Sequence, residues 1–163
     1  MTSVLKVDSI QTAAGKPIVN STGSVLQVVR TYEPNSGFIS TTSTSWTASG
    51  ITASITPSVS GSIILIDFCV PLADCEAGTL QCKMYQSTAG SSYAIMSGGG
   101  LYHAGIQASS TNRYSPIVFG GKYTTTSTAQ VSFQPYFTSV DGASVRLVHS
   151  GSSYSLTLTE IAA

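Results

Sequence analysis

The chain has few charged residues for its length. Asp, Glu, Lys and Arg make up 9% of its 163 residues, and seven acidic and seven basic side chains leave a formal net charge of zero. An average globular domain has about 25% charged residues. Nucleic-acid binding needs clustered Lys and Arg that neutralise phosphates. This chain has no basic run, so we predict that nucleic acid is not its partner.

Long apolar segments are also missing. The longest apolar stretch, residues 63–72, is split by Asp67 and is too short to cross a bilayer, which takes about 20 apolar residues. Near the amino terminus, Lys6 and Asp8 interrupt any apolar core, and no small-residue cleavage site follows. The sequence therefore predicts no membrane partner and a chain that is made and folded in a cytosol.

Cysteine is scarce as well. The three cysteines, Cys69, Cys75 and Cys82, are an odd number without a secretory signal, which argues against a disulfide framework. Cys69 and Cys82 occupy apolar positions of strand-like runs, so we expect both to be small core side chains. Zinc sites usually show C-x-x-C or Cys/His pairs, which this chain lacks. The sequence predicts no metal site and no cofactor.

Ser, Thr and Gly take the place of charged residues, and β-branched and aromatic residues are plentiful, which favours strands. No run has the 3.6-residue periodicity of an amphipathic helix. Strands are predicted at residues 24–33, 38–48, 51–55, 62–70, 79–86, 93–96, 113–119, 129–137, 144–149 and 154–161. Short strands at this spacing predict an all-β fold, which we expect to be a jelly-roll-like antiparallel β-sandwich.

Residues 62–70 are nearly continuous in apolar character, which is typical of a central strand covered on both faces. Asp67 interrupts this run, and a carboxylate is costly to bury without a partner. Arg30, Arg113 and Arg146 are its candidate partners. The alternative is that Asp67 faces solvent or a subunit interface.

Two local signals concern the last three strands. Pro135 lacks an N–H for the sheet, so it predicts an edge or a bend at the end of the strand at residues 129–137. Residues 150–152 have the spacing of a hairpin turn between the final two strands.

The first 29 residues contain short apolar alternations separated by turn formers at residues 14–17 and 20–23. Strand pairs this short are marginal in water, so we expect this segment to pair with another copy or a larger assembly. We predict an extended arm over residues 1–33 and a β-sandwich over residues 34–163, with the strand at 25–32 assignable to either. The predicted attachment residues are Leu5, Val7, Ile10, Ile18, Val19, Val25 and Leu26.

The segment LKVDSIQTAAGKPIVNSTGSVLQVV also resembles the amino-terminal stretch of tail-fibre-like and virion structural proteins of tailed bacteriophages, especially those that infect cyanobacteria and marine bacteria. The closing strand YSLTLTEI resembles the end of such chains. The resemblance is strong over about the first thirty residues and weaker over the rest. It implies a virion location and self-assembly, and it leaves head and tail open. The matching residues are Leu5, Lys6, Val7, Asp8, Ile10, Gln11, Gly15, Lys16, Ser21, Thr22, Gly23, Ser24, Val25, Leu26, Gln27, Val28 and Val29.

Residues with catalytic chemistry are few. His103 and His149 have no partner motif, and no Gly-x-Ser-x-Gly elbow marks a nucleophilic serine. Asp74 and Glu76 are the only acids close together in sequence. A pair of carboxylates can hydrolyse glycosides or hold calcium, but a polar loop capping two strands is the interpretation we favour. We therefore predict a protein that is not an enzyme.

Together these features predict a non-enzymatic phage virion structural protein. We expect a surface β-sandwich, assembled as a homotrimer, that decorates and stabilises the capsid and is anchored by its arm to the major capsid protein or a tail component. One alternative is a short tail or head fibre whose knob binds a host-surface glycan through Tyr93, Tyr102 and Tyr114. A small carbohydrate-active or lectin-like module is the second alternative.

Overall fold

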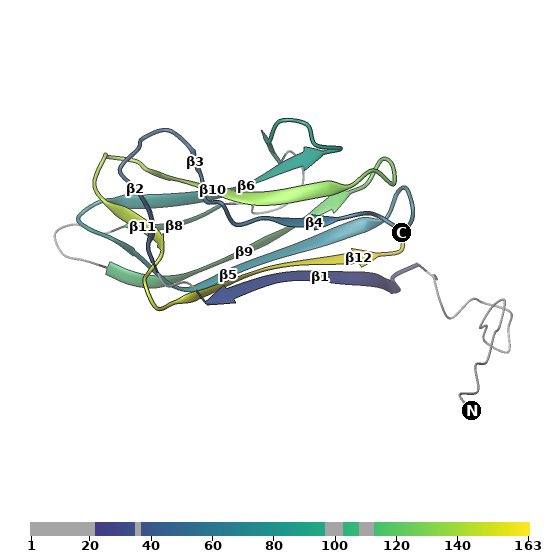
Figure 1. Cartoon of the computed structure of the whole chain (residues 1–163), viewed down its shortest axis with the longest axis horizontal. Coiled ribbons are helices and arrows are strands. Elements are labelled where there is room, and N and C mark those ends of the chain that lie inside the picture. Colours follow the sequence, from purple (N-terminus) through teal and green to yellow (C-terminus); the bar gives the residue numbers. More distant parts are fainter. Residues whose placement is uncertain (1–21, 35–36, 97–102, 108–112) are drawn as a thin grey trace, which may run out of the picture.

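The computed structural model describes residues 22–34, 37–96, 103–107 and 113–163, and these residues contain strands and no helix (Figure 1). The prediction of an all-β antiparallel fold is confirmed. The strands are β1 (Val25–Pro34), β2 (Ile39–Thr41), β3 (Thr47–Ala48), β4 (Ala53–Ile55), β5 (Ile63–Cys75), β6 (Thr79–Thr88), β7 (Ala94–Ile95), β8 (His103–Gln107), β9 (Arg113–Thr124), β10 (Val131–Ser139), β11 (Val145–Val148) and β12 (Ser153–Ile161).

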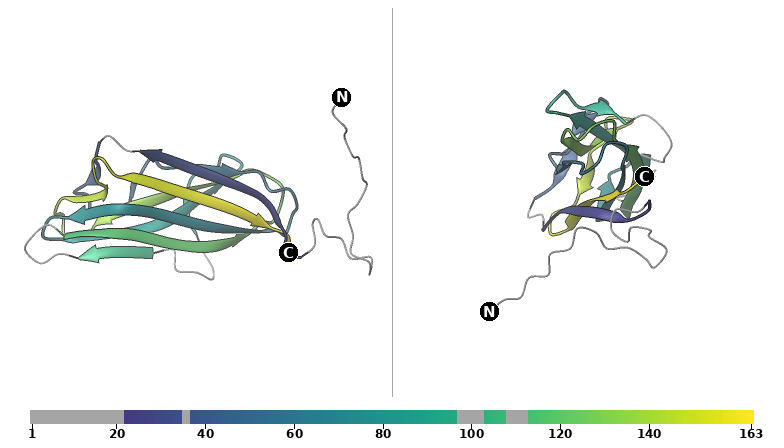
Figure 2. Two further views of the ribbon diagram at one scale, coloured as in Figure 1. Left: turned by 90° about the horizontal axis from the view of Figure 1, so that it is seen from below. Right: turned by 90° about the vertical axis from the view of Figure 1, so that its right-hand side faces the viewer.

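The strands form two antiparallel sheets that pack face to face. The first sheet contains β1, β12, β5 and β9, with β11 and β2 continuing it, and the second contains β3, β4, β10, β6, β7 and β8. Figure 2 (left) shows β1, β12, β5 and β9 side by side in the first sheet.

Several strands are interrupted, so that the twelve segments make eight strands. β1 and β2 lie end to end and pair with β12 and β11, respectively. β3 and β4 lie end to end along β10, and β7 and β8 lie end to end along β6. β11 and β12 follow one another along β5. Numbered in chain order, the eight strands have the order 1-8-3-6 in the first sheet and 2-7-4-5 in the second. This is the strand order of a jelly roll, which the sequence had suggested only from the number of strands.

β11 and β12 do not form the hairpin predicted at residues 150–152. Both run antiparallel to β5, so they share one direction. The register of β5 against β9 shifts between Val70 and Ala73, where Pro71 interrupts the ladder, and the His149 N–H donates to the Leu72 carbonyl there at 3.1 Å. Residues 149–152 thus bridge a bulge rather than reverse the chain.

Pro135 lies in the middle of a central strand, so the predicted edge or bend is wrong. β10 pairs with β6 along its whole length and with β3 and β4 on its other side. The gap between β3 and β4 falls at Pro135, whose carbonyl accepts a hydrogen bond from the Ser49 N–H at 3.1 Å. The interrupted partner strand therefore tolerates the missing N–H of proline.

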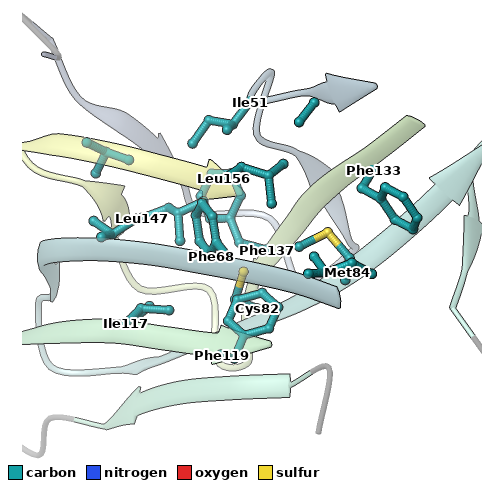
Figure 3. Close-up of a cluster of buried hydrophobic side chains, with 14 of the residues drawn as sticks. Ile51, Phe68, Cys82, Met84, Ile117, Phe119, Phe133, Phe137, Leu147 and Leu156 are labelled. Carbon is teal, nitrogen blue, oxygen red and sulfur yellow. The ribbon is translucent and has the colours of Figure 1, made fainter. Parts of the chain in front are cut away.

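Aromatic and branched side chains from both sheets fill the space between them (Figure 3). Phe68 of β5 and Phe119 of β9 meet edge to face with ring centroids 5.3 Å apart, and Phe133 and Phe137 reach in from β10. These side chains supply most of the apolar burial that stabilises the sandwich.

β5 is central in its sheet, but among the residues that the structure describes, nothing covers one of its faces. Its side chains alternate: Ile64, Ile66 and Phe68 are buried, whereas Leu65 and Asp67 are exposed. The second of the two predicted covers is thus not found among the described residues. Asp67 faces outward, as in the alternative proposed for it.

β1 is part of the sandwich. It pairs with β12 from Val25 to Pro34, so the strand that sequence left between arm and body belongs to the first sheet. Residues 1–21 lie outside the described residues, so an extended arm over that part of residues 1–33 stays a prediction. The described chain starts beside the carboxyl terminus, where the Gly23 N–H donates to the Ala162 carbonyl at 2.7 Å.

Candidate interaction surface

The outward side of β1, β12, β5 and β9, here called the outer face, is a surface to which the sequence assigned no role. Antiparallel partners directly opposite one another place their side chains on the same side of the sheet. The registers give three rows across the four strands: Val28, Thr159, Leu65 and Lys122; Arg30, Thr157, Asp67 and Gly120; and Tyr32, Ser155, Cys69 and Val118.

Two of the four residues in the first row and three of the four in the third row are apolar or aromatic. The exposed fraction is 58% for Val28, 56% for Tyr32 and 66% for Val118, and Leu65 on the central strand is 37% exposed. Single exposed apolar residues are ordinary on a protein surface, whereas several on one sheet face, here on β1, β5 and β9, are a candidate interaction site.

The predicted attachment residues fall on this face only in part. Val25 begins β1, is 60% exposed and lies opposite Ile161, while Leu26 is half-buried beside a register shift. The other predicted attachment residues, Leu5, Val7, Ile10, Ile18 and Val19, lie outside the described residues. The part of the prediction that the structure describes therefore adjoins the outer face.

A buried carboxylate fixes β1 where the described chain begins. Glu160 of β12 is fully buried and accepts hydrogen bonds from Gln27 Nε2 at 2.6 Å, Ser62 Oγ at 2.7 Å and the Ser58 N–H at 2.8 Å. It thereby joins β1, β12 and the loop before β5. Burial by itself raises the pKa of Glu160, but these hydrogen bonds outweigh it and hold the pKa below 4.5.

An ionic cluster lies at the opposite end of the first sheet. Arg146 of β11 is directly opposite Asp74 of β5, and its Nη1 donates to both carboxylate oxygens of Asp74 at 3.2 Å. Glu76 accepts a second bond from Arg146 Nη2, and His149 Nε2 lies 3.6 Å from Asp74. Asp74 is fully buried, so these contacts compensate the cost of removing its charge from water.

This arrangement does not suit the glycosidase chemistry considered for Asp74 and Glu76. Asp74 is inaccessible, and the charges of both acids are directed at the one guanidinium. General acid–base catalysis needs a carboxyl group within reach of substrate. The acids instead hold β5 to β11 through Arg146. Asp74 lies within β5, so the polar loop that we favoured here begins only after it, at Glu76.

Tyr114, one of the predicted glycan contacts, borders this cluster. Its ring centroid is 5.6 Å from that of His149, and Phe38 approaches the same imidazole edge to face at 4.9 Å. The guanidinium of Arg146 lies 4.9 Å from the Phe38 ring. Both Phe38 and Tyr114 are about half exposed, so aromatic faces flank a polar centre. His149, which the sequence predicted to be a loop histidine, thus contacts two aromatic rings and lies beside the Asp74 carboxylate.

The predicted contact Tyr93 lies elsewhere, on the second sheet. Its ring is 6.2 Å from Tyr136, which stacks on Tyr85 at 4.0 Å, and Lys83 lies 4.6 Å from the ring of Trp46 on the same sheet. Tyr93 and Tyr114 are therefore not brought together, and Tyr102 lies outside the described residues. His103 begins β8, so its backbone is in a strand rather than a loop.

The cysteines are all free thiols. Cys82 is buried in the core as predicted, whereas Cys69 is half-buried on the outer face, because it lies opposite Ser155 and Val118. Cys75 takes the core position instead. Burial raises the pKa of the Cys75 and Cys82 thiols.

Within the described residues, no group of three or more His, Cys, Asp or Glu side chains is placed to hold a metal ion. In the same part of the chain, no helix has the length and apolar character needed to cross a membrane.

Comparison with known proteins adds little. No family model matches the chain, and no curated protein matches its sequence. Among solved structures, it is similar to a chain in the structure of infectious bursal disease virus, Gx strain, with a TM-score of 0.44 and 13% identity. The alignment covers 95% of this chain and 36% of that one. At this TM-score and identity the similarity carries no functional information, so we base the function on the chain's own residues.

Proposed function

We propose that the chain is a non-enzymatic structural protein of a tailed-phage virion. In this proposal it assembles as a homotrimer on the particle surface, where it decorates and stabilises the capsid. Its amino-terminal segment attaches it to the major capsid protein or to a tail component.

The apolar outer face is the observation that carries this proposal. Val28, Tyr32, Leu65 and Val118 are exposed on the same face of one sheet. The carboxylate pair considered for catalysis, Asp74 and Glu76, is instead bound to Arg146. A low content of charge does little to keep copies apart. These properties suit a subunit that packs against like neighbours, and the resemblance of the amino-terminal segment to phage virion proteins gives the setting.

Stabilisation of a shell then follows from mass action. A protein that binds the assembled shell, and not its separated subunits, shifts the equilibrium toward the shell in proportion to the logarithm of its concentration over its dissociation constant. This stabilisation needs no catalytic activity of the sandwich, because each bound copy stabilises the shell through the surface that it buries.

Deletion of residues 1–22 tests the attachment role. The deletion keeps Gly23 and Ser24, whose backbones hydrogen-bond to Ala162, so the sandwich is expected to fold as before. We expect the truncated chain to self-associate normally and to be missing from purified particles when it replaces the full chain. Incorporation equal to that of the full chain would contradict the proposed attachment.

A second candidate function is supported by the aromatic side chains around His149. Phe38 and Tyr114 are both about half exposed and contact His149, beside Arg146, a combination of aromatic and polar groups that suits binding of a sugar. In this alternative the sandwich is the knob of a short tail or head fibre. Binding of the wild-type chain to a glycan array, lost in Tyr114→Ala and kept in Tyr93→Ala, would favour it over decoration.

A further inference from the structure

β5 has the sequence of a strand that is covered on both faces, yet the described residues cover only one. Ile63, Leu65 and Cys69 stand on the outer side of this central strand, where an antiparallel sandwich normally presents polar side chains. We infer that the missing cover is a second copy of this chain, packed on the outer face. This inference deepens the self-assembly in the proposed function and rests on it.

Two charged residues of the outer face, Arg30 and Asp67, are complementary between copies. Arg30 on β1 and Asp67 on β5 lie in one row, with Thr157 of β12 between them. Neither takes part in an ion pair with another described residue; the Arg30 guanidinium lies 5.3 Å from the Tyr32 ring. One strand, β12, separates them within the chain, which puts their backbones about 10 Å apart. Both side chains are exposed, so each is placed to meet a partner outside the chain.

The row position determines which residues meet. If the copies are related by rotation about an axis parallel to the strands, no residue moves along the strand direction, so each row of one copy lies level with the same row of its neighbour. Such a rotation therefore brings Arg30 of one copy level with Asp67 of its neighbour, and Val28 level with Leu65. The β1 side of one copy thus offers a cation and apolar side chains to a β5 side that offers an anion and apolar side chains.

The middle of the face allows close approach. β12 presents Ser155, Thr157 and Thr159 outward, and opposite Asp67 on β9 is Gly120, which has no side chain. Short side chains here let two β-layers come together without burying a bulky polar group. In the proposed trimer each copy gives its β1 side to one neighbour and its β5 side to the other, which closes a ring and leaves no outer face exposed.

Charge reversal tests the pairing directly. The full chain, Arg30→Glu, Asp67→Lys and the double variant are compared by light scattering and native mass spectrometry over a dilution series. We expect a mass of three chains for the wild type. Like charges facing one another cost several kcal/mol, so each single variant is expected to dissociate at a concentration roughly tenfold or more higher. The double variant restores opposite charges and is expected to recover most of the loss.

Matched controls separate the outer face from a general effect of charge. Lys83→Glu reverses a positive charge on the second sheet and is the control for Arg30→Glu. For the apolar side chains, Val28→Asp on the outer face is compared with Ile95→Asp on the second sheet, because Val28 and Ile95 are similarly exposed. Only changes on the outer face are expected to weaken association, with circular dichroism unchanged in all variants.

The outcomes are distinct. Recovery in the double variant supports the inference. Three results would overturn it. The first is an oligomer whose dissociation does not change when Arg30 and Asp67 are substituted. The others are a monomer at every concentration, and an outer face covered only by residues 1–21 or by the shell protein. Each of these overturning results leaves the proposed virion role standing if the chain is still found in particles. A mass of two chains with the same charge coupling supports the face and contradicts the trimer.

Discussion

Replacement of Glu160 by Gln is the perturbation whose size the structure defines best. The carboxylate is fully buried, and Oε2 accepts from Gln27 Nε2 at 2.6 Å while Oε1 accepts from Ser62 Oγ at 2.7 Å and the Ser58 N–H at 2.8 Å. An amide keeps one acceptor and places a donor where the other oxygen was. At least one charge-assisted hydrogen bond is lost, and the others become neutral.

A hydrogen bond to a charged group contributes about 1.5–3 kcal/mol. We therefore expect Glu160→Gln to lower the free energy of unfolding by roughly 2–3 kcal/mol at pH 7, a large part of the 5–15 kcal/mol typical of a domain. The assay is urea unfolding at one fixed protein concentration, because association also contributes to stability. Glu33→Gln is the control: Glu33 is exposed and accepts a hydrogen bond from the Tyr154 hydroxyl at 3.1 Å. We expect it to change stability by less than about 0.5 kcal/mol.

The lowered pKa of Glu160 determines how its contribution to stability changes with pH. The folded pKa of Glu160 lies below 4.5, so between that pKa and 4.5 the unfolded chain binds a proton that the folded chain does not. The stabilisation is fully present above 4.5 and is lost as the pH falls through the folded pKa. The gap between wild type and Glu160→Gln should therefore narrow below pH 4.5. A gap that is independent of pH, or no larger than that of Glu33→Gln, would refute the role assigned to this carboxylate.

Two further predictions concern the ionic cluster and the thiols. Arg146→Ala leaves the buried Asp74 charge with His149 as its remaining ion-pair partner, which should lower the free energy of unfolding in urea by about 3 kcal/mol. Adding Asp74→Ala to the same chain should restore part of that free energy, and purely additive losses in the double variant would contradict the pairing. In the folded chain a thiol reagent should modify Cys69 and spare Cys82, whose burial raises its thiol pKa. Labelling of Cys69 should be faster in Arg30→Glu than in the associated wild type, and equal rates would count against the outer face as the contact.

The class of fold was predictable because it depends on local periodicity. Alternation in residues 79–86 and 154–161 located β6 and β12, and turn formers separated most of the strands. β8 was missed because Gly105 interrupts a five-residue segment that has little alternation. The hairpin predicted at residues 150–152 was wrong because a bulge and a reversal use the same turn residues.

The candidate surface was harder to predict, since it depends on which strands are neighbours. An apolar central strand has the same sequence whether its second cover comes from its own chain or from another. Arg146 was considered as a partner for Asp67, but the register places it opposite Asp74. Rows such as the one that joins Arg30 and Asp67 become visible only with the strand order 1-8-3-6.

The most direct test of the proposed function is to count the chain in the phage particle. Quantitative mass spectrometry of purified virions gives the number of copies, and cryo-electron microscopy of the same particles gives their position. We predict many copies spread over the head in groups of three, each group closed around its outer faces. A few copies confined to the tail would contradict capsid decoration, and a chain missing from the particle would contradict a virion role altogether.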